Sequence, residues 1–258
     1  MASSLRRLVE RLSRGIVLVR RLPPEFASTA LHVSPDSALR FWRWHWGPEE
    51  QRLLSWVREL VAPGDVVWDV GANVGVFTFA AAARAGSAGS VTAIEPDPFL
   101  AGLLRRSAQG APRGVASVHV EEAAACDRAG AAVLCVAARG RASNHLFGAG
   151  QTTAGGVRQL REVPGTTLDV LLEKGIPPRI VKIDVEGAEA AVLQGAQGLL
   201  ARQRPVVLCE VSQASRETVT RQLRAAGYGL FDAERAVEDR QPLETAAWNT
   251  LAVPEGRT

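Results

Sequence analysis

The chain has 258 residues, of which 47% are hydrophobic and 22% charged, and its formal net charge is +3. This length and composition suffice for the core of one ordinary to large domain, and no apolar run is long enough to span a membrane. The positive charge rests almost entirely on scattered arginines, since lysine occurs only at Lys174 and Lys182, and this pattern does not indicate a nucleic-acid partner.

Residues 1–47 are predicted to form an N-terminal extension. Apolar residues at positions 5, 8, 9, 12, 16 and 19 recur on one helical face, which predicts a basic amphipathic helix over residues 5–21. Such a helix either packs on the domain or makes a peripheral contact with a membrane surface. No small-residue cleavage site follows a long apolar core, so a secretory signal is not predicted.

Residues 41–46 alternate aromatic and polar side chains. A period of two predicts a short strand with Trp42, Trp44 and Trp46 on one face. Two interpretations remain open. The aromatic face covers the core, or it forms a wall over the substrate pocket, in which case Trp44 and Trp46 contact the substrate.

The remainder, residues 48–258, alternates strand and helix patterns. Helices are expected at 49–62, after the glycine turn to about 86, at 99–109, from Thr166 or Thr167 to 173, at 188–202 and at 215–226. Strands are expected from 66, and at 91–95, 115–121, 131–138, 179–185, 205–211, 228–231 and 250–253, while residues 139–165 form a long loop. Near-continuous apolar strands between helices predict an α/β domain with a parallel sheet covered on both faces.

The most informative stretch joins the first of these strands to its helix. Asp69 precedes the turn Gly71-Ala72-Asn73-Val74-Gly75, and Asn73 stands where dinucleotide enzymes have a glycine. Glycine lets the backbone approach a nucleotide-like ligand, and asparagine tolerates a left-handed backbone. A carboxylate beside the glycines suits a ligand with a cationic aminoacyl end, which favours S-adenosylmethionine.

Glu95 ends the next strand, 24 residues after Gly71. A carboxylate there can accept hydrogen bonds from the vicinal hydroxyls of a ribose. The alternative is that Glu95 caps an exposed strand end.

A second constellation of charged residues lies on the strand at 179–185. Alternation places Lys182, Asp184 and Glu186 on one face, toward the ligand crevice at the strand's carboxyl end. Lys182 is the deepest and needs a partner, for which Asp184 and Glu210 are the candidates. A purely structural network of ion pairs is the alternative.

These motifs resemble one known family. Asp69 to Gly75, Ile94-Glu95-Pro96-Asp97, and Val181-Lys182-Ile183-Asp184-Val185-Glu186-Gly187-Ala188-Glu189 with Val192 to Ala196 are similar to the FkbM family of S-adenosylmethionine-dependent methyltransferases. Segments 124–127, 166–169 and 249–253, with Glu210 and Gly227-Tyr228, fit the same pattern in the same order. The resemblance covers about residues 47–254.

The resemblance implies a Rossmann-like class I methyltransferase fold, with a seven-stranded sheet whose last strand is antiparallel. It also implies O-methylation of a small molecule such as a polyketide, a sugar or another natural product. The residues expected to bind the cofactor are Asp69, Gly71, Ala72, Asn73, Gly75, Glu95, Pro96 and Asp184. Glu186 and Glu189 are expected near the acceptor.

Methyl transfer to an alcohol requires alignment of the reactants and the loss of a proton, so a general base is expected in the site. Asp184 is the first candidate, at the mouth of the crevice. His145 is the second, in the long loop, and Lys182 completes the expected catalytic set. Asp184 and Glu186 offer oxygen ligands to Mg²⁺, but two carboxylates on one strand are not a metal signature, so no metal site is predicted.

The cysteine residues indicate the redox environment of the protein. Cys126, Cys135 and Cys209 are widely spaced in apolar surroundings, which predicts free thiols and a cytoplasmic protein.

Three other functions are alternatives. A methyltransferase acting on a glycan, a lipid-linked sugar, a protein or a nucleic acid shares the cofactor motifs, although no Asn/Asp-Pro-Pro-Tyr strand end is present. The glycine spacing argues against a nicotinamide oxidoreductase. A non-catalytic module that binds S-adenosylmethionine is the remaining alternative.

Overall fold

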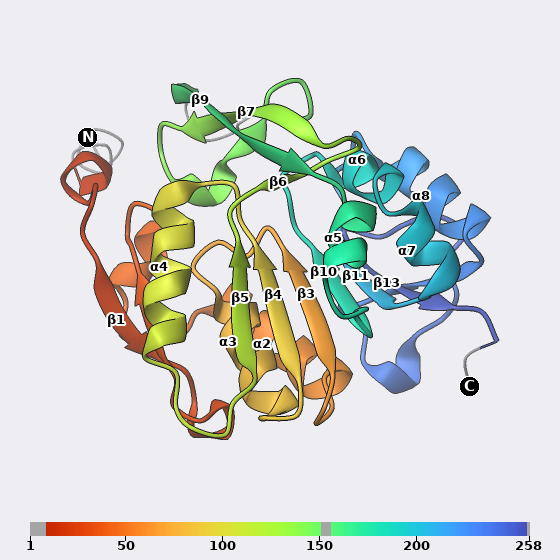
Figure 1. Cartoon of the computed structure of the whole chain (residues 1–258), viewed down its shortest axis with the longest axis horizontal. Coiled ribbons are helices and arrows are strands. Elements are labelled where there is room, and N and C mark those ends of the chain that lie inside the picture. Colours follow the sequence, from red (N-terminus) through yellow and green to blue (C-terminus); the bar gives the residue numbers. More distant parts are fainter. Residues whose placement is uncertain (1–8, 151–155, 257–258) are drawn as a thin grey trace.

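The computed structural model describes residues 9–150 and 156–256. Its centre is a seven-stranded sheet in the order β12-β13-β11-β10-β3-β4-β5 (Figure 1). The strands are β3 (Val66–Val70), β4 (Ser90–Ile94), β5 (Ser117–Glu121), β10 (Ile180–Ile183), β11 (Val206–Glu210), β12 (Tyr228–Asp232) and β13 (Asn249–Pro254). Neighbours pair in parallel except at β13, which is antiparallel to β11 and β12. The predicted α/β fold is confirmed.

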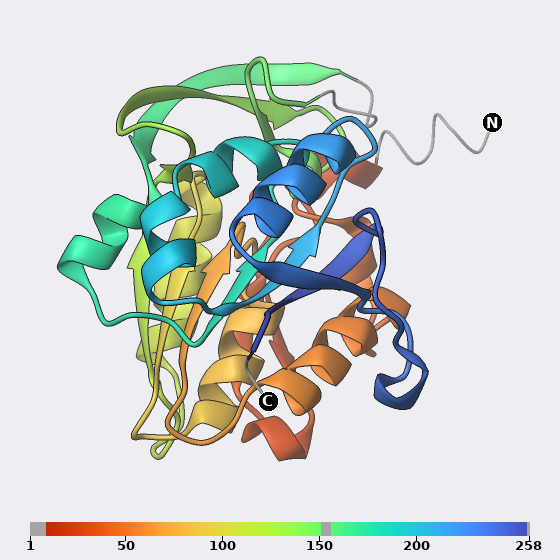
Figure 2. The same cartoon turned by 90° about the vertical axis from the view of Figure 1, so that its right-hand side faces the viewer.

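Helices cover both faces of this sheet (Figure 2). One face carries α2 (Pro48–Leu60), α3 (Val76–Ala85) and α4 (Pro98–Gln109), and the other carries α5 (Leu168–Lys174), α6 (Glu189–Gln194), α7 (Gln197–Arg202) and α8 (Arg216–Ala225). Because side chains alternate along β3, Val67 packs in the core layer under α2, α3 and α4, which is the first core layer. Trp68 and Val70 pack in the second core layer, on the opposite face of the sheet. None of the helices in the described residues is long and apolar enough to cross a bilayer.

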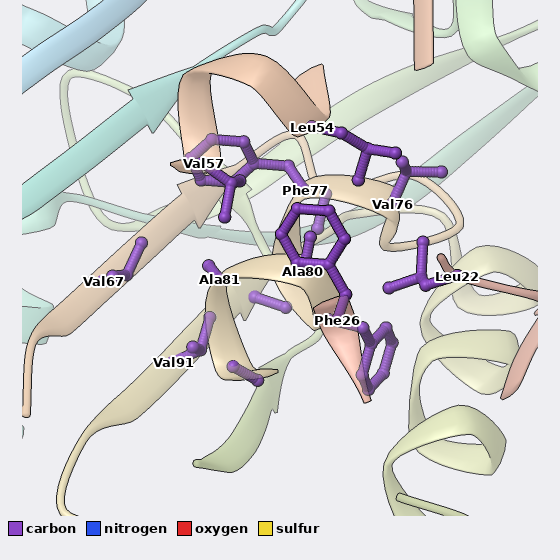
Figure 3. Close-up of a cluster of buried hydrophobic side chains, with 14 of the residues drawn as sticks. Leu22, Phe26, Leu54, Val57, Val67, Val76, Phe77, Ala80, Ala81 and Val91 are labelled. Carbon is purple, nitrogen blue, oxygen red and sulfur yellow. The ribbon is translucent and has the colours of Figure 1, made fainter. Parts of the chain in front are cut away.

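The N-terminal residues share the first core layer. The antiparallel pair β1 (Leu18–Arg21) and β2 (Ala30–Val33) flanks the short helix η1 (Pro24–Phe26). Leu22 and Phe26 are buried against the same cluster as Leu54 and Phe77 (Figure 3). Burying each such side chain contributes about 1.5–3 kcal/mol. The boundary after residue 47 stays a prediction, and the shared core shows that its two sides pack together.

Two N-terminal predictions were wrong. In the described part of the helix predicted over residues 5–21, residues 9–12 are helical but residues 18–21 form β1, because β2 supplies a pairing edge; residues 5–8 lie outside the described part. The predicted tryptophan strand is the helix η2 (Leu39–Trp42) followed by a bend. In this segment the Arg20 guanidinium donates to the carbonyls of Phe41 and Arg43, at 3.0 and 2.9 Å. These backbone acceptors are therefore hydrogen-bonded without a neighbouring strand.

The long loop predicted at 139–165 was wrong in part, and residues 151–155 lie outside the described residues. After the short helix η3 (Arg141–Ser143), β8 (His145–Leu146) and β9 (Val157–Thr166) join β6 (Ala124–Ala125) and β7 (Gly130–Ala137) in a second sheet ordered β6-β9-β7-β8. Six of the ten β9 residues are exposed, and its apolar residues Val157, Leu160 and Val163 do not alternate, so periodicity gives no strand signal here and pairing with β7 stabilises the strand. The second sheet lies across the carboxyl ends of the parallel strands (Figure 1).

The single helix predicted at 188–202 is divided into α6 and α7. A side chain at Gly195 would place its Cβ 2.1 Å from the carbonyl oxygen of Cys126. This close approach brings the turn before β7 against the break between the helices. The three thiols of the chain are free, and Cys135 and Cys209 are buried.

Candidate functional site

A cavity of about 250 Å³ opens at the carboxyl ends of β3, β4, β10 and β11. Three parts of the chain line it. The loops after the parallel strands contribute Gly71, Asn73, Glu95, Pro96, Asp184, Glu186 and Glu210, the segment before and at the start of α2 contributes Arg40 and Glu49, and the second sheet contributes Leu134 and residues 141–146. Ligands bind at this edge of open α/β sheets, so the cavity is the candidate site.

Lys182 is the centre of a buried network beneath the cavity. Its amino group donates to the Asp69 carboxylate at 2.9 Å and to the Gly71 carbonyl at 3.1 Å, and it lies 3.5 Å from the Asp184 carboxylate. Burial alone would lower the pKa of Lys182, but the charges of Asp69 and Asp184 outweigh it and raise the pKa above its ordinary value. The network therefore joins β3 and β10 and holds Asp184 beside the glycine turn.

Asp69 lies beneath the cavity wall. Its side chain is fully buried, where it accepts hydrogen bonds from Lys182 and from the Thr78 hydroxyl, the latter at 2.6 Å. Asp69 is not among the residues that line the cavity. The carboxylate that we expected to contact the cofactor is therefore the counterion of Lys182, a partner that the sequence analysis did not consider.

The glycine turn is built from backbone conformations that its residues tolerate. Gly71, Asn73 and Gly75 have φ values of 77°, 54° and 85°. A Cβ on Gly71 would lie 1.8 Å from the carbonyl oxygen of Asp184, so this glycine permits contact between two chain segments. Gly75 packs against side chains of α3 and α4, and Ala72 is buried in the core. Within the glycine turn, Gly71 and Asn73 are the residues that line the cavity.

Glu95 joins the two loops that border the cavity. Its carboxylate accepts the backbone N–H of Asn73 at 2.8 Å and that of Asp97 at 2.9 Å. Burial raises the pKa of Glu95 to about 7, although these hydrogen bonds act in the opposite direction. A carboxylate offers about four acceptor sites, so two remain for hydroxyl groups of a ligand.

The other end of the cavity carries an acidic wall of Asp184, Glu186 and Glu210. Burial, reinforced by the charge of Asp184, raises the pKa of Glu186 to about 7 and that of Glu210 to about 8. Glu186 does not continue β10 as predicted. The strand ends at Ile183, and Glu186 lies in a turn with φ of 52°. Crowded carboxylates of this kind suit a cationic ligand.

The raised pKa of Glu210 predicts a pH effect on stability. An unfolded chain has a Glu pKa of about 4.3, so the folded protein binds this proton more tightly and loses stability as pH rises from about 4.3 to about 8. Glu210→Gln is therefore expected to raise the free energy of unfolding at about pH 8.5 by roughly 1–3 kcal/mol. Urea unfolding across this range, with the exposed Glu217→Gln as control, checks it. Identical pH curves for wild type and Glu210→Gln would contradict the assignment.

A polar cluster fixes the second sheet over the cavity. The Arg141 guanidinium donates to Asp97 and, at 2.8 Å, to Asp36, while Arg158 makes two hydrogen bonds of 2.9 Å to Asp36. Asn144 donates to Asp97 at 2.8 Å. The cluster thereby connects the N-terminal segment, the start of α4 and the second sheet into one rim.

His145 is brought to the cavity by this sheet. It is buried on β8, with Nδ1 3.4 Å from the Ser143 carbonyl oxygen, and it lines the wall. The sequence placed His145 near the site as a loop residue, and the structure places it there on a strand.

Three residues expected near the substrate lie elsewhere. Glu189 is buried and accepts the Gly187 N–H and the hydroxyls of Ser212 and Ser215, so its oxygens are used in the fold. Trp44 and Trp46 are not among the residues that line the cavity. The bend after η2 turns this segment away from the wall that a strand would have formed.

The N-terminal segment and the second sheet bring to the wall residues that the sequence did not indicate, above all Arg40, Glu49, Arg141 and Asn144. They lie far from the motifs in sequence and follow no spacing rule. Among the described residues, no group of three or more His, Cys, Asp or Glu side chains could hold a metal ion.

Comparisons with known proteins place the chain in a family. The family model for the methyltransferase FkbM domain matches residues 69–230. Hexuronic acid methyltransferase AglP of Haloferax volcanii is 28% identical over 178 residues, which cover 68% of each protein.

Solved structures are similar at low identity. Methyltransferase FkbM from Methylobacillus flagellatus KT aligns with a TM-score of 0.47 and 12% identity over 78% of this chain and 50% of that one, so the present chain spans about half its length. Magnesium protoporphyrin IX methyltransferase (ChlM) from Synechocystis PCC 6803 with bound SAM aligns with a TM-score of 0.46 and 13% identity, covering 85% and 93%. The FkbM model, however, spans more than half of the chain and includes the glycine turn, Glu95 and the Lys182 network. The chain belongs to the FkbM family of S-adenosylmethionine-dependent methyltransferases.

Proposed function

We propose that this enzyme methylates a hydroxyl group of a small molecule, with sugars as the first acceptor class. The observation that carries the proposal is the Asp184 carboxylate, which lies on the cavity wall and 3.5 Å from the buried Lys182 amino group. A fixed carboxylate at the end of β10 is suited to accept the proton that a hydroxyl must lose. The relative named as a hexuronic acid methyltransferase supports a sugar acceptor.

The cavity wall suits S-adenosylmethionine. Glu95 has acceptor positions left for the ribose hydroxyls, and the acidic wall of Asp184, Glu186 and Glu210 matches a ligand with positive charge. We assign the backbone of Gly71 and Asn73, together with Pro96, to the same binding site. When bound, the cofactor supplies an electrophilic methyl group.

The residues of the chain then have separate tasks. Asp184 accepts the acceptor proton, and Lys182 holds the Asp184 carboxylate in position. The second sheet excludes water from the cavity, and Glu186 binds further hydroxyls of the acceptor. His145, on the same wall, is the second candidate for the base. Alignment of the reactants in such a site can contribute roughly 7–11 kcal/mol.

Transfer of a radiolabelled methyl group to a panel of acceptors tests this function. Glucuronic acid and its neutral parent sugar, a polyphenol, a bulk RNA and a denatured protein mixture make up the panel. We expect label on a hydroxylated small molecule and a large loss of it with Asp184→Asn. Label confined to RNA or protein would support the other acceptor classes instead. Cofactor binding without transfer to any hydroxyl would favour a non-catalytic module.

A further inference from the structure

An exposed surface of unusual composition lies on the N-terminal segment. It consists of Leu12, Arg20, Trp42, Arg43 and Trp44, which we name the tryptophan–arginine face. Trp44 is 87% exposed, Leu12 68% and Trp42 43%. Exposed apolar side chains that gather on one face mark an interaction surface.

The face is held in place by specific contacts. The Arg20 guanidinium stacks on the Trp44 ring at 4.7 Å and donates to the carbonyls of Phe41 and Arg43. The Trp42 indole N–H donates at 3.0 Å to the hydroxyl of Ser13, which is itself buried. The two tryptophans are therefore fixed in exposed positions by contacts with two other chain segments.

The two segments that carry the face have charged side chains of one sign. Residues 11–21 and 38–46 contain six arginines and no aspartate or glutamate. Tryptophan with arginine is the combination that binds at the interface of an anionic bilayer, where the ring enters the headgroup region and the cation pairs with phosphate. RNA also pairs with arginine and stacks on tryptophan, but the exposed aliphatic Leu12 favours lipid.

The tryptophan–arginine face lies next to a second cavity, because its residue Arg43 also lines that cavity. This cavity, lined by Arg43, Gly47 and Arg139 among others, shares Arg40, Glu49, Ala142 and Ser143 with the wall of the methyl-transfer cavity.

We propose that the tryptophan–arginine face docks the enzyme peripherally on an anionic lipid surface. Exposed aromatic rings fixed among arginines, with no acid in either segment, carry this inference. It is independent of the identity of the methyl acceptor, because it concerns a surface outside the catalytic cavity.

Cosedimentation of the full chain with vesicles tests the inference. The probes are phosphatidylcholine vesicles with about 30% phosphatidylglycerol, and vesicles of phosphatidylcholine alone. We expect binding to the anionic vesicles that weakens as salt is raised. Arg43→Ser is expected to reduce it about fivefold, the effect of one basic residue at an anionic surface. Trp44→Ser is expected to reduce it by about the same factor or more, because it removes a ring that enters the headgroup region. Matched controls are Ile176→Ser, at a 63% exposed residue before β10, and Arg221→Ser on α8.

The outcomes are distinct. Loss of vesicle binding in the two face variants, with both controls unchanged, supports the inference. No sedimentation of the wild type with anionic vesicles, equal loss in the controls, or binding to poly(U) RNA in place of vesicles would overturn it. Titration of each variant with S-adenosylhomocysteine shows that the fold and the cofactor site are intact, so the result is separate from that of the methyl-transfer assay.

Discussion

Lys182→Met is expected to lower the free energy of unfolding by about 3–5 kcal/mol and to remove methyl transfer. The substitution leaves Asp69 fully buried without its cation, and the Thr78 hydroxyl cannot neutralise the carboxylate. It also removes the cation that lies beside Asp184 and the donor to the Gly71 carbonyl. Urea unfolding followed by tryptophan fluorescence measures the change.

The chain provides its own control for this experiment. Lys174, the other lysine, is exposed at the end of α5, and Lys174→Met should change stability by less than about 0.5 kcal/mol. The double variant Asp69→Asn with Lys182→Met should recover part of the stability, because no buried charge is left unpaired, while activity stays low. A Lys182→Met protein as stable as the wild type would show that the network does not stabilise the fold.

Asp184→Asn is expected to lower kcat by about 10²–10⁴-fold with little change in the affinity for S-adenosylmethionine, because Glu186 and Glu210 remain on the wall that faces its positive charge. The amide has the shape of the carboxylate but cannot accept the acceptor proton. Since Asp184 is partly exposed and Lys182 keeps its shorter contact with Asp69, the fold should persist. Single-turnover rates and calorimetric affinities separate the two effects.

Two further variants make this prediction specific. Asp127→Asn, at an exposed position in the turn before β7, is the matched control and should leave the rate unchanged. His145→Ala distinguishes the two candidate bases on the cavity wall. A normal rate with Asp184→Asn and a large loss with His145→Ala would transfer the role of base to His145.

The parallel sheet could be predicted because the strand and helix patterns that specify it lie within short stretches of the sequence. The apolar strands alternate with helices of sufficient length, and Thr167 caps α5 as expected by accepting the Val170 N–H at 3.0 Å. The positions of Glu95 and Asp184 at strand ends follow from the same topology, since parallel strands bring their carboxyl ends to one edge.

The rest of the site depends on contacts between distant segments. Nothing in the sequence near Asp69 indicates that its partner is Lys182, because the pairing of β3 with β10 arises from a crossover. The apolar residues of β9, Val157, Leu160 and Val163, are spaced three apart and do not alternate, so the sequence pattern predicts a loop there. The tryptophan run fits a strand by alternation, but hydrogen bonds from Arg20 to backbone carbonyls stabilise a bend instead.

The central claim is that the cofactor binds where β3 and β4 end, with its ribose on Glu95. Calorimetric titration of S-adenosylhomocysteine into wild type, Glu95→Ala and the exposed-site control Glu121→Ala tests it most directly. The account predicts an affinity at least about tenfold weaker for Glu95→Ala, or about 1.4 kcal/mol, and no change for the control. Equal affinity in all three proteins, with Glu95→Ala still folded, would contradict it.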